Sequence, residues 1–360
     1  AFSSIILPYQ RKCRKPFFVS LIFTNADAMI SFKEQLPDFA GRYHGGSFMT
    51  VKPPVFGGKP YRSLDYHLRN RYGEKIYKVS LDGGMTCPNR DGTLGKCGCI
   101  FCSEGGSGDF AGDRTHPIHQ QIEEQKARLS PKFPATHFIA YFQAYTNTYA
   151  PLSYLERIFT EAIEHEDIVG LSIGTRPDCL PDETLDLLSE LNKKKPVTVE
   201  LGLQTIHERT AAFIRRGYKL SCFEDALEKL QERKLETVVH TILGLPGETT
   251  EDILETMHYL NAHHIDGIKL QLLHVLKHTD LAAYYGQTGF HILSEDEYVD
   301  LVIHCLEVLS PDITIHRLTG DGPSDLLIAP LWSLKKRSVL NHIHHELKVR
   351  DTWQGRLFTE

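Results

Sequence analysis

Strand-like and helix-like segments alternate along this chain from Lys75 to Leu273, and this alternation constrains the fold more than any other feature of the sequence. The strand-like runs are short and apolar or β-branched, as is typical of parallel strands that are buried on both faces. They are predicted at Ile76–Leu81, His137–Gln143, Ile168–Gly174, Val197–Gly202, Thr237–Leu243 and Gly267–Leu273. A repeated strand–helix order predicts an α/β fold with a parallel sheet, either open and doubly wound or curled into a full or partial (β/α) barrel. In each case ligands bind beyond the carboxyl ends of the strands.

Helix start signals lie between these strands. Ser153 with Glu156, and Ser294 with Glu297, have the spacing of capping boxes. Asp182 is expected to cap the helix that follows it, and Thr249 begins a further helix.

The order of elements changes after about Leu293, where a helix, a short strand at Ile313–His316 and a helical tail are expected. We therefore divide the chain into a core at 49–290 and a C-terminal extension at 291–360 that packs on it. Residues 1–48 are expected to be a poorly ordered extension.

Composition narrows the class of protein. The 360 residues are 41% hydrophobic and 24% charged, which is ordinary for a globular protein. No apolar run reaches the roughly 18 residues of a membrane span. The formal net charge of -6 argues against wholesale binding to nucleic-acid backbones, although it leaves a local basic groove possible.

Four of the eight cysteines fall in one short segment, at 87, 97, 99 and 102. A disulfide framework is typical of smaller secreted domains, so this grouping indicates metal or cluster ligands in a reducing compartment, and we expect a cytoplasmic protein. Thiolates bind iron–sulfur clusters, and Cys87, Cys99 and Cys102 would leave one iron open. A structural zinc site with four thiolates is the alternative. In that case Cys97 would be the fourth ligand; otherwise it is a spare thiol.

The cysteine segment resembles the cluster loop of a radical S-adenosylmethionine (SAM) subfamily whose cysteines run C-x11-C-x2-C. The similarity extends from about Tyr61 to Phe358 and is carried by Leu81-Asp-Gly-Gly, Cys87-Pro-Asn-Arg-Asp-Gly, Gly108-Asp-Phe-Ala-Gly, Tyr141-Phe-Gln-Ala, Thr175-Arg-Pro-Asp-Cys, Glu200-Leu-Gly-Leu-Gln-Thr, Gly244-Leu-Pro-Gly-Glu and His316-Arg-Leu-Thr-Gly-Asp-Gly-Pro. Cys97 stands where members of the subfamily usually carry glycine. The resemblance implies a partial (β/α)6 TIM-type barrel, a [4Fe–4S] cluster on Cys87, Cys99 and Cys102, and SAM as the second cofactor. The C-terminal region of the chain also resembles the corresponding region of the Elongator catalytic subunit.

Glu200 and Gln204 are candidates for binding the nucleoside part of SAM. Alternation in the fourth strand places Glu200 opposite the apolar face of Val197, Val199 and Leu201, and a buried acid needs a partner or a ligand. With the resemblance, Glu200 and Gln204 are expected to bind SAM from the barrel lumen. A structural ion pair of Glu200 is the alternative.

Three further positions are candidates for cofactor contacts. Arg216 corresponds to an arginine of the subfamily and is expected to meet the SAM carboxylate; alternatively it complements a helix dipole, with Gly217 as the C-cap. Arg176 ends the third strand, where it contacts substrate or cofactor or else pairs with Asp178. The turn at Gly244 either cradles the adenosine part or only starts a helix.

The resemblance also implies a substrate and partners. The expected reaction converts a carboxymethylaminomethyl group on a tRNA wobble uridine to aminomethyl, with electrons from a donor such as flavodoxin or ferredoxin. His316, Arg317 and Asp321 are candidates to close over the substrate. The alternative is a zinc-stabilised RNA- or protein-binding module without radical chemistry.

Overall fold

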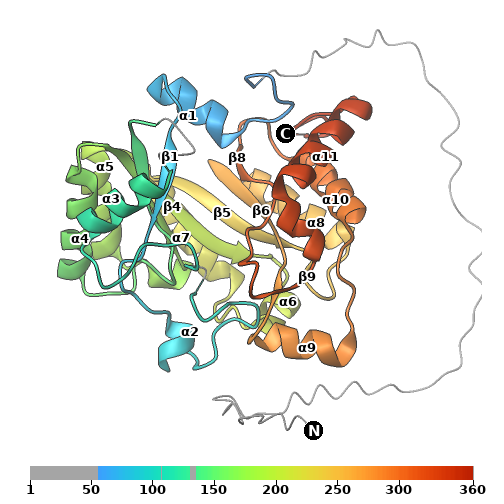
Figure 1. Ribbon diagram of the computed structural model, residues 1–360, viewed down its shortest axis with the longest axis horizontal. Helices are drawn as coiled ribbons and strands as arrows, with labels where there is room; N and C mark the ends of the chain where they lie inside the picture. Colours follow the sequence, from blue (N-terminus) through green and yellow to red (C-terminus); the bar gives the residue numbers. More distant parts are fainter. Residues whose placement is uncertain (1–55, 107, 130–134, 360) are drawn as a thin grey trace, which may run out of the picture. The chain divides into compact units, whose positions relative to one another are not determined.

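The fold is organised by one curved parallel sheet (Figure 1), as seen in a computed structural model that describes residues 56–106, 108–129 and 135–359. Seven strands lie in the order β1-β2-β3-β4-β5-β6-β8. Each neighbouring pair is parallel. The expected partial barrel is confirmed, and the described residues form one compact unit. The expected disorder of 1–48 lies outside the described residues.

The strands begin and end within two residues of the predicted positions. They are β1 Tyr77–Leu81, β2 Phe138–Phe142, β3 Ile168–Thr175, β4 Val197–Gln204, β5 Glu236–Leu243, β6 Gly267–Leu272 and β8 Thr314–Arg317. The last of these confirms the strand expected in the C-terminal region. It joins the main sheet beside β6, so the region after 290 contributes directly to the barrel wall.

Helices cover the outer face of the sheet (Figure 1). Those between or after the strands are α3 Ile118–Leu129, α4 Leu152–Glu164, α5 Asp182–Lys194, α7 Leu220–Glu232, α8 Thr250–Ala262, α10 Glu295–Val308 and α11 Lys336–Val349. Their apolar stripes and the outward side chains of the strands form one continuous core that includes Phe142, Phe159, Val199, Leu201 and Phe223.

Short elements lie at the two ends of the barrel. Helix α1 Leu64–Tyr72 lies where the strands begin, and α2 Pro88–Asp91, α6 Glu208–Phe213 and α9 Asp280–Thr288 lie where they end (Figure 1). Strands β7 Val275–Leu276 and β9 Leu327–Ala329 form a separate antiparallel pair. No helix among the described residues is long and apolar enough to cross a membrane.

The capping box predicted at Ser294 is confirmed, and the caps predicted at Ser153 and Asp182 are wrong. Thr249 and Ser294 each form a complete capping box, with Asp252 and Glu297 as the third residues. Helix α4 begins at Leu152 after Pro151, so Ser153 lies inside the helix. Asp182 is the first helical residue of α5, again after a proline. In both cases proline takes the cap position because its fixed φ suits the turn that enters a helix.

Candidate functional site

The cysteine segment lies on the loop that follows β1, at the carboxyl end of the sheet, where the fold places ligands. Cys87 immediately precedes the short helix α2, and Pro88 starts that helix. A tight turn joins the other two cysteines, since the amide of Cys102 donates to the carbonyl of Cys99 at 3.1 Å. The amide of Ile100 donates to the carbonyl of Ile214 at 3.2 Å, which ties this turn to the loop after β4.

Asn89 holds the cluster loop against the loop after β4. Its Nδ2 donates to the carbonyls of Arg215 and Arg216 at 2.8 and 3.1 Å, and it lies 3.7 Å from Sγ of Cys99. Gly217 has a φ of +86°, and a Cβ there would lie 2.5 Å from Oδ1 of Asn89. Glycine is therefore required for this close approach.

The prediction that Gly217 caps a helix is wrong, because α6 ends at Phe213 and its cap is Ile214. The chain leaves the helix before Gly217, with Arg215 already in the left-handed region at a φ of +58°. The glycine serves the contact with Asn89 instead.

The three expected ligands lie close together, beside Arg90 and Arg176. Burial raises the pKa of Cys99 to about 12; nearby Cys102 and Cys87 raise it too, while Arg176 opposes the rise. Arg90 crosses the loop and donates to the carbonyls of Cys102 and Ser103 at 3.1 and 2.5 Å. Thiolates gathered beside Asn89, Arg90 and Arg176 suit an iron–sulfur cluster, whose sulfurs accept such hydrogen bonds and whose thiolates need compensating charge.

Arg176 and Arg216 lie at the carboxyl end of the sheet, but both are strongly engaged by protein groups. Arg176 donates two hydrogen bonds to Asp178, at 2.9 and 2.7 Å, which is the ion pair considered as the alternative to a cofactor contact. It also donates to the carbonyl of Arg216. Arg216 is 1% exposed and donates to the carbonyls of Leu203, Thr205 and Tyr218. Direct contact of either with SAM stays a prediction.

Glu200 lies at the centre of a buried ion cluster in the barrel. Its Oε1 accepts from Lys78 Nζ and Ser172 Oγ, each at 2.6 Å. Its Oε2 accepts from His240 Nε2 at 2.6 Å and from Lys269 Nζ, which also contacts the hydroxyl of Tyr141 at 3.0 Å.

Six strands, from β1 to β6, thus each supply one polar side chain to this cluster. Burial alone would raise the pKa of Glu200, but Lys269 and Lys78 outweigh it and hold the pKa well below its usual range. Both carboxylate oxygens are occupied, so the structure shows the ion-pair arrangement, and the role of Glu200 toward SAM stays a prediction.

Gln204 and Gly244 end β4 and begin the turn after β5. Gln204 has a φ of +66°, which is unusual for a residue other than glycine, and a register shift separates it from Gly202 in the pairing with β5. Gly244 has a φ of +87° at a turn that requires glycine. Both positions lie on the same edge of the sheet as the cysteine loop, as their predicted roles need.

The side chains that bind Glu200, and the asparagine that holds the cysteine loop, were not predicted from the sequence. Lys78, His240 and Lys269 are polar residues inside apolar strands, and the alternation argument used for Glu200 would have placed them in the lumen as well. Asn89 carried no comparable signal, because its contacts depend on how two distant loops meet.

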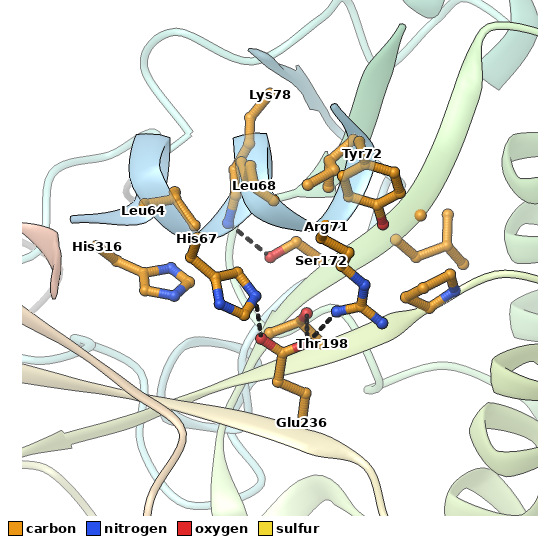
Figure 2. Close-up of a pocket in the computed structure, with 14 residues that line it drawn as sticks. Leu64, His67, Leu68, Arg71, Tyr72, Lys78, Ser172, Thr198, Glu236 and His316 are labelled. Atoms are coloured by element: carbon orange, nitrogen blue, oxygen red, sulfur yellow. Dashed lines mark hydrogen bonds and ion pairs between the residues drawn. The ribbon is translucent and has the colours of Figure 1, made fainter. Parts of the chain in front are cut away.

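A small cavity occurs at the opposite end of the barrel, where α1 closes the starts of the strands (Figure 2). His67 and Arg71 of α1 pair there with Glu236, at 3.7 and 3.1 Å. The cavity has a volume of about 20 Å³, which is room for one water molecule. It therefore offers no space for a substrate. An open pocket lies instead at the carboxyl end, between the loops after β2 and β3, and includes Tyr149, Asp178 and Cys179.

Comparison with known proteins shows the family of the chain. The Radical SAM superfamily model matches residues 87–260, and the Radical_SAM C-terminal domain model matches residues 265–349. The uncharacterized protein YtqA of Bacillus subtilis (strain 168) is 46% identical over 300 residues, which is 83% of this chain and 93% of YtqA. Elongator complex protein 3 of Schizosaccharomyces pombe is 27% identical over 162 residues, 44% of this chain and 29% of that protein.

Among solved structures, the Elp3 of the archaeon Methanocaldococcus infernus, lacking its N-terminal residues 1–46, superposes with a TM-score of 0.60. The match has 16% identity and covers 78% of this chain and 64% of that chain, so it shows a shared fold. The parallel half-barrel, the cysteine loop at its carboxyl end and the high identity to YtqA lead to one conclusion: this chain belongs to the radical SAM superfamily.

Proposed function

We propose that this radical SAM enzyme modifies the 5-position side chain of a tRNA wobble uridine, converting carboxymethylaminomethyl to aminomethyl. The observation that carries the proposal is the similarity to the Elongator catalytic subunit in both sequence and fold. A [4Fe–4S] cluster held by Cys87, Cys99 and Cys102 would supply the electron that cleaves SAM. We expect a flavodoxin or ferredoxin to provide that electron in the cytoplasm.

The residues at the carboxyl end would position and shield this chemistry. Asn89 and Arg90 fix the cluster loop, and Arg176 holds the loop after β3 to the loop after β4 through the carbonyl of Arg216. A site built from several loops that are tied to each other restrains its ligands and restricts the entry of water.

The loops after β1 also carry groups suited to single-stranded RNA. Phe110 and Leu94 are 52% and 53% exposed, and the cations Lys96 and Arg114 on the same loops are exposed as well. Exposed aromatic side chains stack on unpaired bases, while lysine and arginine bind phosphates. These four side chains would contact the anticodon loop although the whole protein is acidic.

The test is binding of a tRNA anticodon stem-loop carrying carboxymethylaminomethyluridine to anaerobically purified, cluster-loaded protein. We expect binding that weakens steeply between about 50 and about 200 mM salt, because counterions are released from phosphates. The double variant Lys96→Gln/Arg114→Gln should bind more weakly and show a shallower salt dependence. A matched variant on the outer helix α5, Lys193→Gln/Lys194→Gln, should bind like the wild type. The proposal fails if the stem-loop does not bind at low salt, or if bound stem-loop is not converted to aminomethyluridine when SAM and reductant are added.

A further inference from the structure

Arg317 is the last residue of β8, in the C-terminal region, and is half-buried. It is aligned with Lys269 of β6, and a register shift directly before this pair makes His316 an extra residue in the strand. Such bulges redirect side chains next to functional sites. The charge of Arg317 acts on interior groups: burial lowers the pKa of Lys269 to about 7 and that of His240 to about 4, and Arg317 contributes to both shifts.

Arg317 makes fewer hydrogen bonds and ion pairs with described protein groups than the other cations of the barrel do. Lys78 and Lys269 each donate to Glu200 and to a neighbouring hydroxyl, and Arg176 and Arg216 each make three hydrogen bonds. Arg317 makes no hydrogen bond to any described residue, and its only ion pair is with Asp321 at 3.4 Å.

Asp321 is itself engaged by another cation. Both of its carboxylate oxygens accept from Lys336 Nζ at 2.7 Å, which leaves Arg317 with the longer, weaker contact. Glu200 is already paired with Lys78 and Lys269, and Asp321 lies closer to Lys336 than to Arg317. Among the described residues Arg317 therefore shares its one carboxylate with a closer cation, and an anion at Arg317 would complete its pairing.

The surroundings of Arg317 are accessible and polar. Its side chain is 27% exposed, so a ligand can reach it. Among the described residues, His274 Nε2 and Thr319 Oγ1 are buried without a hydrogen-bond partner. Gly320 and Gly322 pack against the His274 ring, where a Cβ would come within 2.4 and 3.0 Å, so the loop after β8 lies directly against the end of β6.

We propose that Arg317 binds the carboxylate of the substrate's side chain, and so selects a carboxymethylaminomethyl group over an uncharged or cationic one. The inference rests on the proposed function and adds the residue that recognises the group to be removed. A guanidinium group matches a carboxylate with two parallel hydrogen bonds, and Arg317 has donors available for them. Loss of the carboxylate in the product would weaken binding and so favour product release.

The test compares two anticodon stem-loops that differ only in the carboxymethyl group, one with carboxymethylaminomethyluridine and one with aminomethyluridine. We expect cluster-loaded wild-type protein to bind the first roughly tenfold to hundredfold more tightly, the range for hydrogen bonds to a charged group. Arg317→Gln should remove this preference by weakening binding of the first loop, without weakening binding of the second. Arg317→Lys keeps the charge without the planar fork and should retain part of the preference, which guards against a folding defect in the first variant. Arg69→Gln, on α1 at the other end of the barrel, should behave like the wild type.

The other outcomes distinguish failure of the inference about Arg317 from failure of the proposed function. A preference that persists in Arg317→Gln would overturn the inference and leave the proposed function intact. Equal weakening of both loops would assign Arg317 to a backbone phosphate. Loss of SAM binding in equilibrium dialysis, with the loop preference intact, would assign it to the SAM carboxylate. If neither loop binds the wild type, the proposed function fails and the inference fails with it.

Discussion

At the scale of single residues, Glu200 is the carboxylate at the centre of the buried ion cluster in the barrel. It is fully buried and accepts hydrogen bonds from two lysines, a histidine and a serine. Glu200→Gln should lower the free energy of unfolding by about 3–5 kcal/mol, because Lys78 and Lys269 would be left without their counter-ion. Urea titration measures this, with the exposed Glu164→Gln expected within about 0.5 kcal/mol of the wild type. A small effect of Glu200→Gln on unfolding together with a large loss of SAM binding would show that the residue serves the cofactor instead.

His240 makes the same cluster sensitive to acid. Burial lowers its pKa from 6.5 to about 4, and Lys269 adds to the lowering, so the folded protein holds fewer protons than the unfolded chain between these values. Neutral His240 therefore contributes its full share to the free energy of unfolding above pH 6.5. This contribution, up to about 3 kcal/mol, is lost as the pH falls toward 4. The lowered pKa of Glu200 adds a further loss below about pH 4.5, since its folded form resists protonation.

Urea unfolding of His240→Asn at several pH values measures this contribution. The fall in stability between pH 6.5 and 4 should be shallower than in the wild type. His258→Asn, an exposed histidine on α8, provides the matched control and should keep the wild-type slope. Identical slopes in wild type and His240→Asn would contradict the assignment.

At the scale of secondary structure, the capping box of α10 fixes the helix that connects the C-terminal region to the barrel. Ser294 Oγ accepts from the Glu297 amide at 3.2 Å, and the Glu297 carboxylate accepts from the Ser294 amide at 2.8 Å. Ser294→Ala should cost about 1 kcal/mol in unfolding free energy, since one amide at the helix start loses its partner. Ser153→Ala is the control, because Ser153 lies inside α4 and makes no capping bond. Equal effects of the two changes would contradict the assignment of the cap.

At the scale of the whole molecule, the sequence predicted where the strands lie but not which polar side chains contact each other across distant segments. Strand positions followed from short apolar runs, which are decided locally, so even the strand at 313–316 was found. The errors at Ser153 and Asp182 arose because proline took the cap position in each case.

The binding of Arg216 to three carbonyls and of Asn89 to two loops depends on contacts between distant segments, which no local pattern encodes. The cysteine loop was predicted because its spacing is local, and its position at the carboxyl end follows from the parallel sheet. The residues that surround it had to be found in the structure.

Radical chemistry in this protein requires the cluster that Cys87, Cys99 and Cys102 are proposed to hold. The most direct measurement is anaerobic analysis of iron, sulfide and zinc with a visible spectrum, on wild type, Cys99→Ala and Cys305→Ala, whose thiol is buried in α10 away from the loop. We expect about four iron and about four sulfide per chain in the wild type and in Cys305→Ala, and loss of both in Cys99→Ala. One tightly bound zinc per chain, with no iron after reconstitution, would contradict the radical mechanism and support a zinc-stabilised module.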